Sequence, residues 1–126
     1  MARILIIDDD GDVRETVVRL LELDGHEIAA PPSSRDVSAA IEAGDYDLVV
    51  TDVIMPEMDG IEVVRKVRKA RPNCPILAIS GGSSSMSSRT LLHMVGALGA
   101  DATMKKPFSR AELQAAIGAL LVGGGF

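Results

Sequence analysis

The sequence predicts an α/β fold in which a parallel sheet of five strands carries helices on both faces. Short apolar runs of strand length alternate five times with segments whose apolar residues recur at helical spacing. Three runs, at residues 4–7, 48–50 and 76–79, are continuously apolar, as in strands that are covered on both sides. At 126 residues the chain suits one core, so we expect one domain over residues 1–122 and a flexible tail over 123–126.

The first half of the chain is expected to contain three strand–helix units. The expected strands cover residues 3–8, 27–30 and 48–52, and the expected helices cover residues 12–23, 35–43 and 60–70. In the first helix, Val13 and Val17 lie on one face, and Gly25 follows the last turn as a helix stop. Ser33 or Ser34 is expected to cap the second helix, because a serine side chain can accept hydrogen bonds from the first free N–H groups.

The second half adds two further units. We expect strands over residues 76–80 and 102–105, helices over residues 87–98 and 109–122, and a loop over residues 81–85. Ser109 and Glu112 have the spacing of a capping box, in which each side chain bonds the backbone N–H of the other residue. Strand order does not follow from this pattern alone.

Composition excludes several classes of function. The net charge of −5 disfavours direct binding to a nucleic acid, and no apolar stretch approaches the ~20 residues of a membrane-spanning helix. The N-terminus lacks the pattern of a signal peptide. Cys74 is the single cysteine, so the chain holds no internal disulfide and no thiolate metal cluster. These features favour a reducing, cytoplasmic location.

Acids, a hydroxyl and an ammonium group stand where four of the predicted strands end. These residues are Asp8, Asp9, Asp52, Ser80 and Lys106. The carboxyl ends of parallel strands are where sheets of this kind bind ligands. Caps and loop acids are the simpler explanation for any one of these residues, because acids are common there. The whole set at four strand ends favours a functional site.

The chemistry of this set points to a divalent metal and a phosphoryl group. Three neighbouring carboxylates repel one another and need a cation, and an all-oxygen set suits Mg²⁺ better than zinc. A carboxylate can attack phosphorus to give an aspartyl phosphate, which is the role we expect for Asp52. Lys106 can pair with a phosphoryl oxygen as a point charge, and Ser80 can donate a hydrogen bond.

Four motifs in order carry a specific resemblance. They are Ile-Ile-Asp-Asp-Asp at residues 6–10, Asp52 followed by Met-Pro-Glu-Met-Asp-Gly at 55–60, Ile-Ser-Gly at 79–81 and Lys-Pro-Phe at 106–108. Over nearly its whole length the chain resembles the receiver domains of two-component response regulators, in particular the single-domain, chemotaxis-regulator-like members. The resemblance implies a doubly wound, flavodoxin-like sheet with strand order 2-1-3-4-5.

The resemblance also implies the roles of the acids. Asp52 is similar to the phosphoacceptor, which takes a phosphoryl group from a phosphohistidine of a sensor histidine kinase or a histidine phosphotransfer protein. Mg²⁺, or Mn²⁺, is implied as the cofactor, with Asp9, Asp52 and the backbone carbonyl of Ile54 as ligands and Asp8 as a ligand mainly through water. Such a domain is no enzyme beyond its own phosphorylation and dephosphorylation.

The remaining family features concern switching. The resemblance implies that Ser80 bonds the phosphoryl group, that Lys106 pairs with it, and that the Lys106–Pro107 peptide is cis. Helix four, strand five and helix five would then form the face that meets a downstream protein target, without direct contact to nucleic acid or membrane. This chain has Thr103 where the family usually has Tyr or Phe, so how switching works stays open. The sequence also leaves open whether the chain acts alone or within a longer regulator or hybrid kinase.

One departure from the family suggests a property of the phosphorylated state. Ile54 has an apolar side chain, which cannot orient an attacking water. We therefore expect a longer phosphoryl lifetime than in family members with a polar residue at this position.

Two other readings compete. Asp8 and Asp10 resemble the nucleophile and the acid/base of haloacid-dehalogenase-type phosphatases, but Asp12 stands where that family has Thr or Val, and Asp52 would have no role. Alternatively, the chain is an interaction module with a receiver fold and an inactive site. The complete set of acids, hydroxyl and lysine argues against this second reading, while the missing aromatic residue favours it.

Four residues near these motifs have simpler roles. Asp10 is expected in a loop or as a helix cap, and Asp59 as the cap of the third helix. His26 is expected to be solvated in a turn, and His93 to lie on the surface of the fourth helix.

Overall fold

The computed structural model describes residues 2–55, 58–80, 88–97 and 99–124. The main sheet contains the strands β1 (Arg3–Ile7), β2 (Glu27–Ala29), β3 (Leu48–Asp52), β6 (Ile76–Ser80) and β7 (Ala102–Lys105). The helices are α1 (Gly11–Leu23), α2 (Val37–Ala43), α3 (Gly60–Ala70), α4 (Ser88–Ala97) and α5 (Arg110–Gly124). Among the described residues, no helix is long and apolar enough to cross a bilayer.

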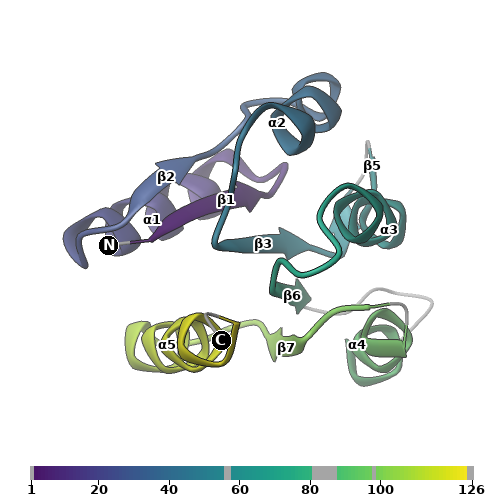
Figure 1. Cartoon of the computed structure of the whole chain (residues 1–126). Coiled ribbons are helices and arrows are strands. Elements are labelled where there is room, and N and C mark those ends of the chain that lie inside the picture. Colours follow the sequence, from purple (N-terminus) through teal and green to yellow (C-terminus); the bar gives the residue numbers. More distant parts are fainter. Residues whose placement is uncertain (1, 56–57, 81–87, 98, 125–126) are drawn as a thin grey trace.

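The five strands of the main sheet are all parallel and lie in the order β2-β1-β3-β6-β7 (Figure 1). Since β6 and β7 are the fourth and fifth strands of this sheet along the chain, this is the order 2-1-3-4-5 that the resemblance implied. The sequence did not predict the short antiparallel pair β4 (Ile54–Met55) and β5 (Met58–Asp59), which follows β3.

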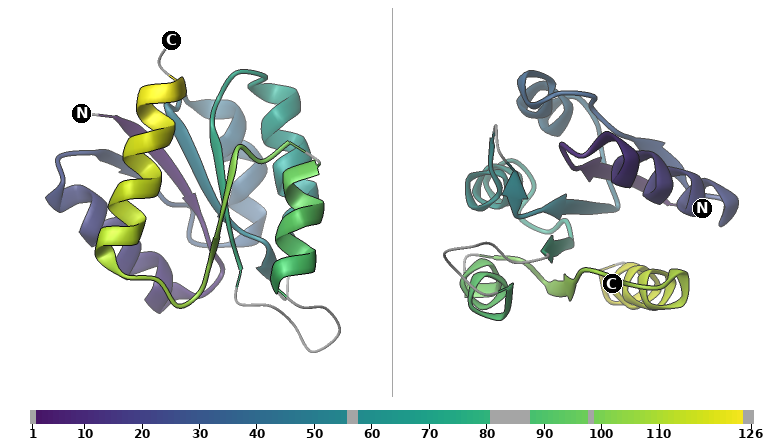
Figure 2. Two further views of the ribbon diagram at one scale, coloured as in Figure 1. Left: turned by 90° about the horizontal axis from the view of Figure 1, so that it is seen from below. Right: turned by 180° about the vertical axis from the view of Figure 1, so that it is seen from behind.

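The core lies on both faces of the sheet because successive residues of a strand point to opposite sides. In β1, Leu5 and Ile7 pack among buried side chains of α2, α3 and α4, whereas Ile4 and Ile6 pack against α1 and α5. Figure 2 shows these two groups of helices on opposite sides of the sheet. Double coverage explains why the central strands are continuously apolar in sequence.

Two helix starts follow the predicted capping chemistry. The Asp10 carboxylate accepts hydrogen bonds from the backbone N–H groups of Asp12 (3.0 Å) and Val13 (3.3 Å), and so caps α1. At α5 the N–H of Glu112 donates to Ser109 Oγ (3.0 Å), while the N–H of Ser109 donates to Glu112 Oε1 (3.2 Å). The expected capping box at α5 is therefore confirmed.

The predicted start of the second helix was wrong. A 3₁₀ turn covers Ser34–Asp36, and α2 begins only at Val37 instead of at Arg35. The Ser33 hydroxyl donates to the Asp36 carboxylate (2.9 Å), and the helix N-terminus receives no side-chain cap. Serine and aspartate side chains often form such local bonds, which compete with regular helix capping.

Other sequence-based expectations differ or lie outside the described residues. Helix α5 runs to Gly124, two residues beyond its predicted end at residue 122. The loop expected at residues 81–85, residues 125–126 of the expected tail and the side chain of Asp59 lie outside the part that the structure describes.

The two histidines differ in their surroundings. His93 is exposed on α4, as expected. His26 is only partly solvated, because its Nδ1 accepts a hydrogen bond from the backbone N–H of Ala2 (3.2 Å).

The end of the sheet opposite the acidic residues is closed by Arg68 of α3. Its guanidinium donates to the backbone carbonyls of Pro72 (2.8 Å), Cys74 (2.9 Å) and Gly99 (2.6 Å). It also bonds the Asp101 carboxylate (2.7 Å), whose Oδ2 accepts from the N–H of the first residue of β6 (2.8 Å). One side chain thus fixes α3, β6 and the turn before β7 to one another.

Gly60, the first residue of α3, fixes how this helix meets the end of β3. A methyl group on Gly60 would overlap the backbone of Val53, the residue after β3. This close approach is available only without a Cβ atom. The glycine therefore sets the path of the chain directly after Asp52.

We predict that Gly60→Ala lowers the free energy of unfolding by about 1–3 kcal/mol, because backbone atoms must shift to admit the methyl group. Gly118→Ala is the matched control: it lies inside α5 and has open space around its Cα. The control should raise the free energy of unfolding by about 0.5–1 kcal/mol, because alanine favours the helix. Urea unfolding followed by circular dichroism measures both. Similar changes in the two variants would contradict the close approach at Gly60.

Candidate functional site

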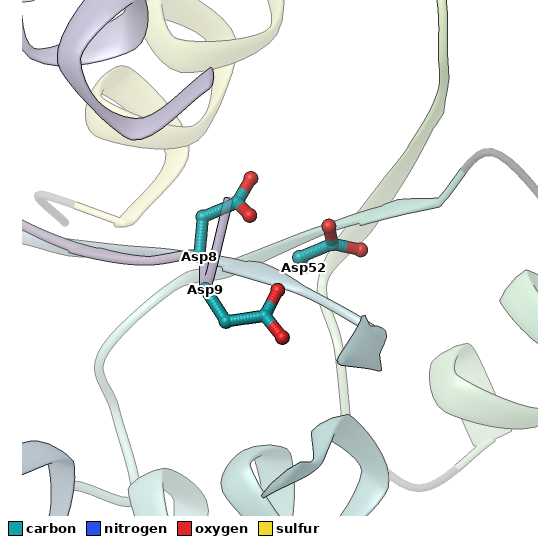
Figure 3. Close-up of side chains that lie close together, drawn as sticks. All are labelled: Asp8, Asp9 and Asp52. Atoms are coloured by element: carbon teal, nitrogen blue, oxygen red, sulfur yellow. The ribbon is translucent and has the colours of Figure 1, made fainter. Parts of the chain in front are cut away.

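The acids at the ends of β1 and β3 come together at one edge of the sheet. The register pairs Ile7 with Thr51, so the next residues, Asp8 and Asp52, leave adjacent strands at the same level. Carboxylate oxygens of Asp8, Asp9 and Asp52 lie within 4.8 Å of one another (Figure 3). Within the described part of the chain, these three form the one group of acids, histidines or cysteines that is arranged to hold a metal ion.

Two of these carboxylates are largely withdrawn from water. Asp8 and Asp52 are 9% and 7% exposed, whereas Asp9 is exposed. Burial raises the pKa of Asp8 above its ordinary value. The backbone N–H of Asp10 opposes this shift by donating to Asp8 Oδ1 (3.0 Å), while the nearby charge of Asp52 adds to it. The folded chain therefore disfavours the ionised form of Asp8.

Lys106 supplies the cation that faces the buried acids. Its Nζ lies 2.7 Å from Asp52 Oδ2 and 3.5 Å from Asp8 Oδ2. Burial alone would lower the pKa of Lys106, but the bonds and charges of the two carboxylates outweigh burial and raise it. The side chain is therefore an ammonium group at neutral pH. The Lys106–Pro107 peptide is cis, as the resemblance implied.

Ser80 stands beside Asp52 at the end of the next strand. The register pairs Asp52 with Ile79, and Ser80 is the following, fully buried residue of β6. Ser80 also joins the site to β7, because it pairs with Lys105 and its carbonyl accepts from the N–H of Lys106 (3.0 Å). A change in the position of Ser80 can thus be transmitted to the edge strand.

The remaining predicted residues lie as follows. Ile54 begins β4, two residues after Asp52. Thr103 is exposed on β7, and no described contact ties it to the acidic group. Asp10 is not a member of the acidic group, because its carboxylate caps α1. The phosphatase alternative, which needs Asp10 as acid/base, therefore loses the residue on which it depends.

Sequence reasoning missed two residues that bond the backbone of the acids. The guanidinium of Arg14 donates to the carbonyl of Asp8 (2.9 Å), and the buried Thr51 hydroxyl donates to the carbonyl of Asp52 (2.9 Å). The sequence contained a feature that could have pointed to each of these two residues. A cation in the first turn of a helix opposes the helix dipole, and a hydroxyl interrupts the apolar run of β3, so each needs a partner.

The arrangement is suited to a small divalent cation. Three carboxylates lie together at a partly buried position, and the Lys106 ammonium group bonds two of them. Mg²⁺ prefers oxygen ligands and keeps several waters, so a site that is open on the side of the exposed Asp9 fits it. The donor set lacks the histidine and cysteine ligands that zinc prefers.

Known proteins of one family share this fold and sequence. The family model of the response regulator receiver domain matches residues 4–118. The response regulator MprA of Mycolicibacterium vanbaalenii is 39% identical over 121 residues, which cover 94% of this chain and 50% of that protein. The chain spans half or less of the length of this and two other curated relatives.

Solved structures agree with this relationship. A CheY-like receiver domain protein from Methanospirillum hungatei has a TM-score of 0.89 at 28% identity, with 99% of this chain and 97% of that chain covered. The response regulator TrrA from Thermotoga maritima, solved in complex with Mg²⁺-BeF, has a TM-score of 0.81 at 28% identity, with 95% and 99% covered. Receiver domains are the phosphoacceptors of two-component signalling and interact with kinases or phosphotransfer proteins. The chain belongs to the response regulator receiver domain family.

Proposed function

We propose that Asp52 is the phosphoacceptor of this receiver domain and takes its phosphoryl group from a phosphohistidine of a sensor histidine kinase or a histidine phosphotransfer protein. The observation that supports this most is the position of Asp52. It is a buried acid at a strand end, 2.7 Å from the ammonium group of Lys106 and within 4.8 Å of two further carboxylates. Neither a helix cap nor a surface acid needs such surroundings.

We assign the metal site to Asp8, Asp9, Asp52 and the backbone carbonyl of Ile54, with Mg²⁺ or Mn²⁺ as the ion. The oxygen-only donor set and the close approach of its three carboxylates support this assignment. The related TrrA was solved with Mg²⁺-BeF. When bound, the divalent ion neutralises charge on the phosphoryl oxygens.

The phosphoryl transfer proceeds as a displacement at phosphorus. A carboxylate oxygen of Asp52 attacks, the new O–P bond forms as the P–N bond to the donor imidazole breaks, and that electron pair stays on the imidazole nitrogen. The Lys106 ammonium group pairs with one phosphoryl oxygen, and the Ser80 hydroxyl donates to another. Water later hydrolyses the aspartyl phosphate to Asp52 and inorganic phosphate. The chain acts on no other substrate in this proposal.

A groove beside the site is suited to the donor protein. A cavity of about 480 Å³ lies between α1 and the connection from β7 to α5. It is lined by Val13, Thr16, Val17, Leu20, Lys106, Pro107, Phe108 and Arg110. The lining is mainly apolar, as in grooves that bind an amphipathic helix, and Lys106 connects it to Asp52. A donor helix seated there would bring its phosphohistidine to the acidic edge.

The output face in this proposal is formed by α4, β7 and α5. Ser80 pairs with Lys105 of β7, so phosphorylation can bias an equilibrium between two arrangements of this face. A hollow of about 960 Å³ lies along α4 and β7. Its lining is Thr90, His93, Gly96, Ala97, Ala100, Asp101, Ala102, Thr103 and Lys105. These mostly small side chains leave room for side chains of a downstream protein target.

The wider setting stays a prediction. The chain spans half or less of the length of MprA and of two other curated relatives, so the activity of a longer regulator is outside this proposal. The receiver boundary at residues 1–122, the cytoplasmic location and the lack of direct contact with nucleic acid or membrane are predictions from the sequence.

The phosphoacceptor assignment predicts one acid-labile adduct at Asp52. The protein is incubated with Mg²⁺ and acetyl phosphate, and intact mass and peptide mapping locate the adduct. Asp52→Asn should abolish the gain in mass, because the amide cannot attack phosphorus. The control Asp12→Asn replaces an exposed acid close to the site in sequence, and it should be phosphorylated like the wild type. An adduct that persists in Asp52→Asn would refute the assignment.

The metal assignment predicts that Asp8→Asn stabilises the fold in the absence of Mg²⁺ but weakens the stabilisation that Mg²⁺ provides. The fold raises the pKa of Asp8 and so favours its neutral form, which means that the ionised carboxylate lowers stability at neutral pH. Asp8→Asn should therefore raise the urea midpoint without metal. Mg²⁺ should raise the urea midpoint of the wild type and of Asp12→Asn. It should raise the midpoint of Asp8→Asn by a much smaller amount. Equal stabilisation of all three proteins by Mg²⁺ would place the ion elsewhere.

We predict that the side chain at position 54, two residues after Asp52, affects the lifetime of the phosphorylated state. Ile54→Asn adds a polar side chain that can orient an attacking water, so the aspartyl phosphate should decay severalfold faster. The measurement follows loss of the adduct by intact mass after removal of the phosphodonor. Equal decay in wild type and variant would count against this role.

A further inference from the structure

We propose that Arg14 is a positioning residue of the acidic site, which holds the peptide between Asp8 and Asp9 in the orientation that metal binding requires. This inference rests on the proposed function, in which both acids serve the metal. The guanidinium of Arg14 donates a hydrogen bond to the backbone carbonyl of Asp8. It acts through the backbone.

The contacts of Arg14 close a small ring at the end of β1. Its Nη1 donates to the carbonyl of Asp8 (2.9 Å), and its backbone N–H donates to the carbonyl of Asp10 (2.9 Å). The N–H of Asp10 donates to the Asp8 carboxylate (3.0 Å) and completes the ring. The half-buried guanidinium lies over Gly11, where an added methyl group would be 3.5 Å from Nη2. The first turn of α1 is thereby tied to the loop that carries the acids.

The bonded carbonyl belongs to the peptide unit that joins the two acids. A peptide unit is planar and contains the Cα atoms on both of its sides. An anchor on the Asp8 carbonyl therefore sets the directions in which the side chains of Asp8 and Asp9 leave the chain. These directions differ, since Asp8 is buried and Asp9 exposed. Without the anchor, the repulsion among the three carboxylates can be relieved by rotation of this peptide.

The position of Arg14 on its helix supports a specific role. A cation in the first turn opposes the helix dipole, so helix stability alone does not explain it. A second explanation is that Arg14 only offsets the negative charge of the site. The two explanations predict opposite changes in metal affinity. Loss of a positioning bond weakens metal binding, whereas loss of a nearby positive charge strengthens it.

The test compares Mg²⁺ affinity by isothermal titration calorimetry in the wild type, Arg14→Met and Arg19→Met. Arg19 is the matched control, because it is an exposed arginine on the same helix. Arg14→Met should bind Mg²⁺ about tenfold more weakly, the loss typical when a residue that supports a metal ligand is removed. Arg19→Met should bind about as tightly as the wild type. Tighter or unchanged binding in Arg14→Met overturns the inference.

A second variant separates geometry from charge. Arg14→Lys keeps the positive charge but replaces the planar guanidinium by a compact ammonium group. It should also bind Mg²⁺ more weakly than the wild type, whereas a role of charge alone predicts no change. Urea unfolding without metal reports any purely structural role. Lower stability of Arg14→Met with wild-type Mg²⁺ affinity overturns the inference.

The outcomes distinguish a failure of the proposed function from a failure of the role of Arg14 alone. If the wild type binds no Mg²⁺, or if Asp52→Asn is phosphorylated, the proposed function fails and the role of Arg14 fails with it. If the wild type binds Mg²⁺ and depends on Asp52, while Arg14→Met binds like Arg19→Met, only the role of Arg14 is lost.

Discussion

Charge repulsion at the edge of the sheet is the constraint that organises this domain. Oxygens of three carboxylates lie within 4.8 Å of one another, and two of these acids are largely buried. Such a group costs free energy unless positive charge faces it. Lys106 meets part of this requirement through its bonds to Asp52 and Asp8 and is itself kept ionised by them. This clustered negative charge is the basis of our proposal that the site binds a divalent cation and, with the cation, a phosphoryl group.

The backbone around the site holds this unfavourable arrangement in place. The N–H of Asp10 bonds the Asp8 carboxylate, while the Asp10 side chain caps α1. On the other strand, Thr51 bonds the carbonyl of Asp52, and α3 begins in direct contact with the chain after β3. At the opposite end of the sheet, Arg68 joins α3, β6 and the turn before β7. The acids are thus held by rigid elements, and the pairing of β6 with β7 connects the site to the face that we propose for output.

The sequence by itself determined most of the elements and the members of the acidic site. The strands at Leu48–Asp52 and Ile76–Ser80 were predicted with their observed bounds, because the apolar runs at residues 48–50 and 76–79 are typical of parallel strands that are covered on both faces. The start of α5 was predicted from Ser109 and Glu112, because a capping box depends on residues close in sequence. The strand ends also identified Asp52 and Lys106, since parallel strands bring their carboxyl ends to one edge.

Only the tertiary structure decided which groups around these residues share a contact. The start of α2 depends on whether the Ser33 hydroxyl bonds a helix N–H or the Asp36 carboxylate. Both hydrogen bonds are compatible with the local sequence. Likewise, the sequence does not state that Arg14 turns back to the carbonyl of Asp8, nor that Asp8 is buried while Asp9 is exposed. Side-chain direction and burial depend on how α1 and β3 pack against the end of β1. Periodicity gives the elements, whereas contacts between elements are set by three-dimensional packing, which no local pattern contains.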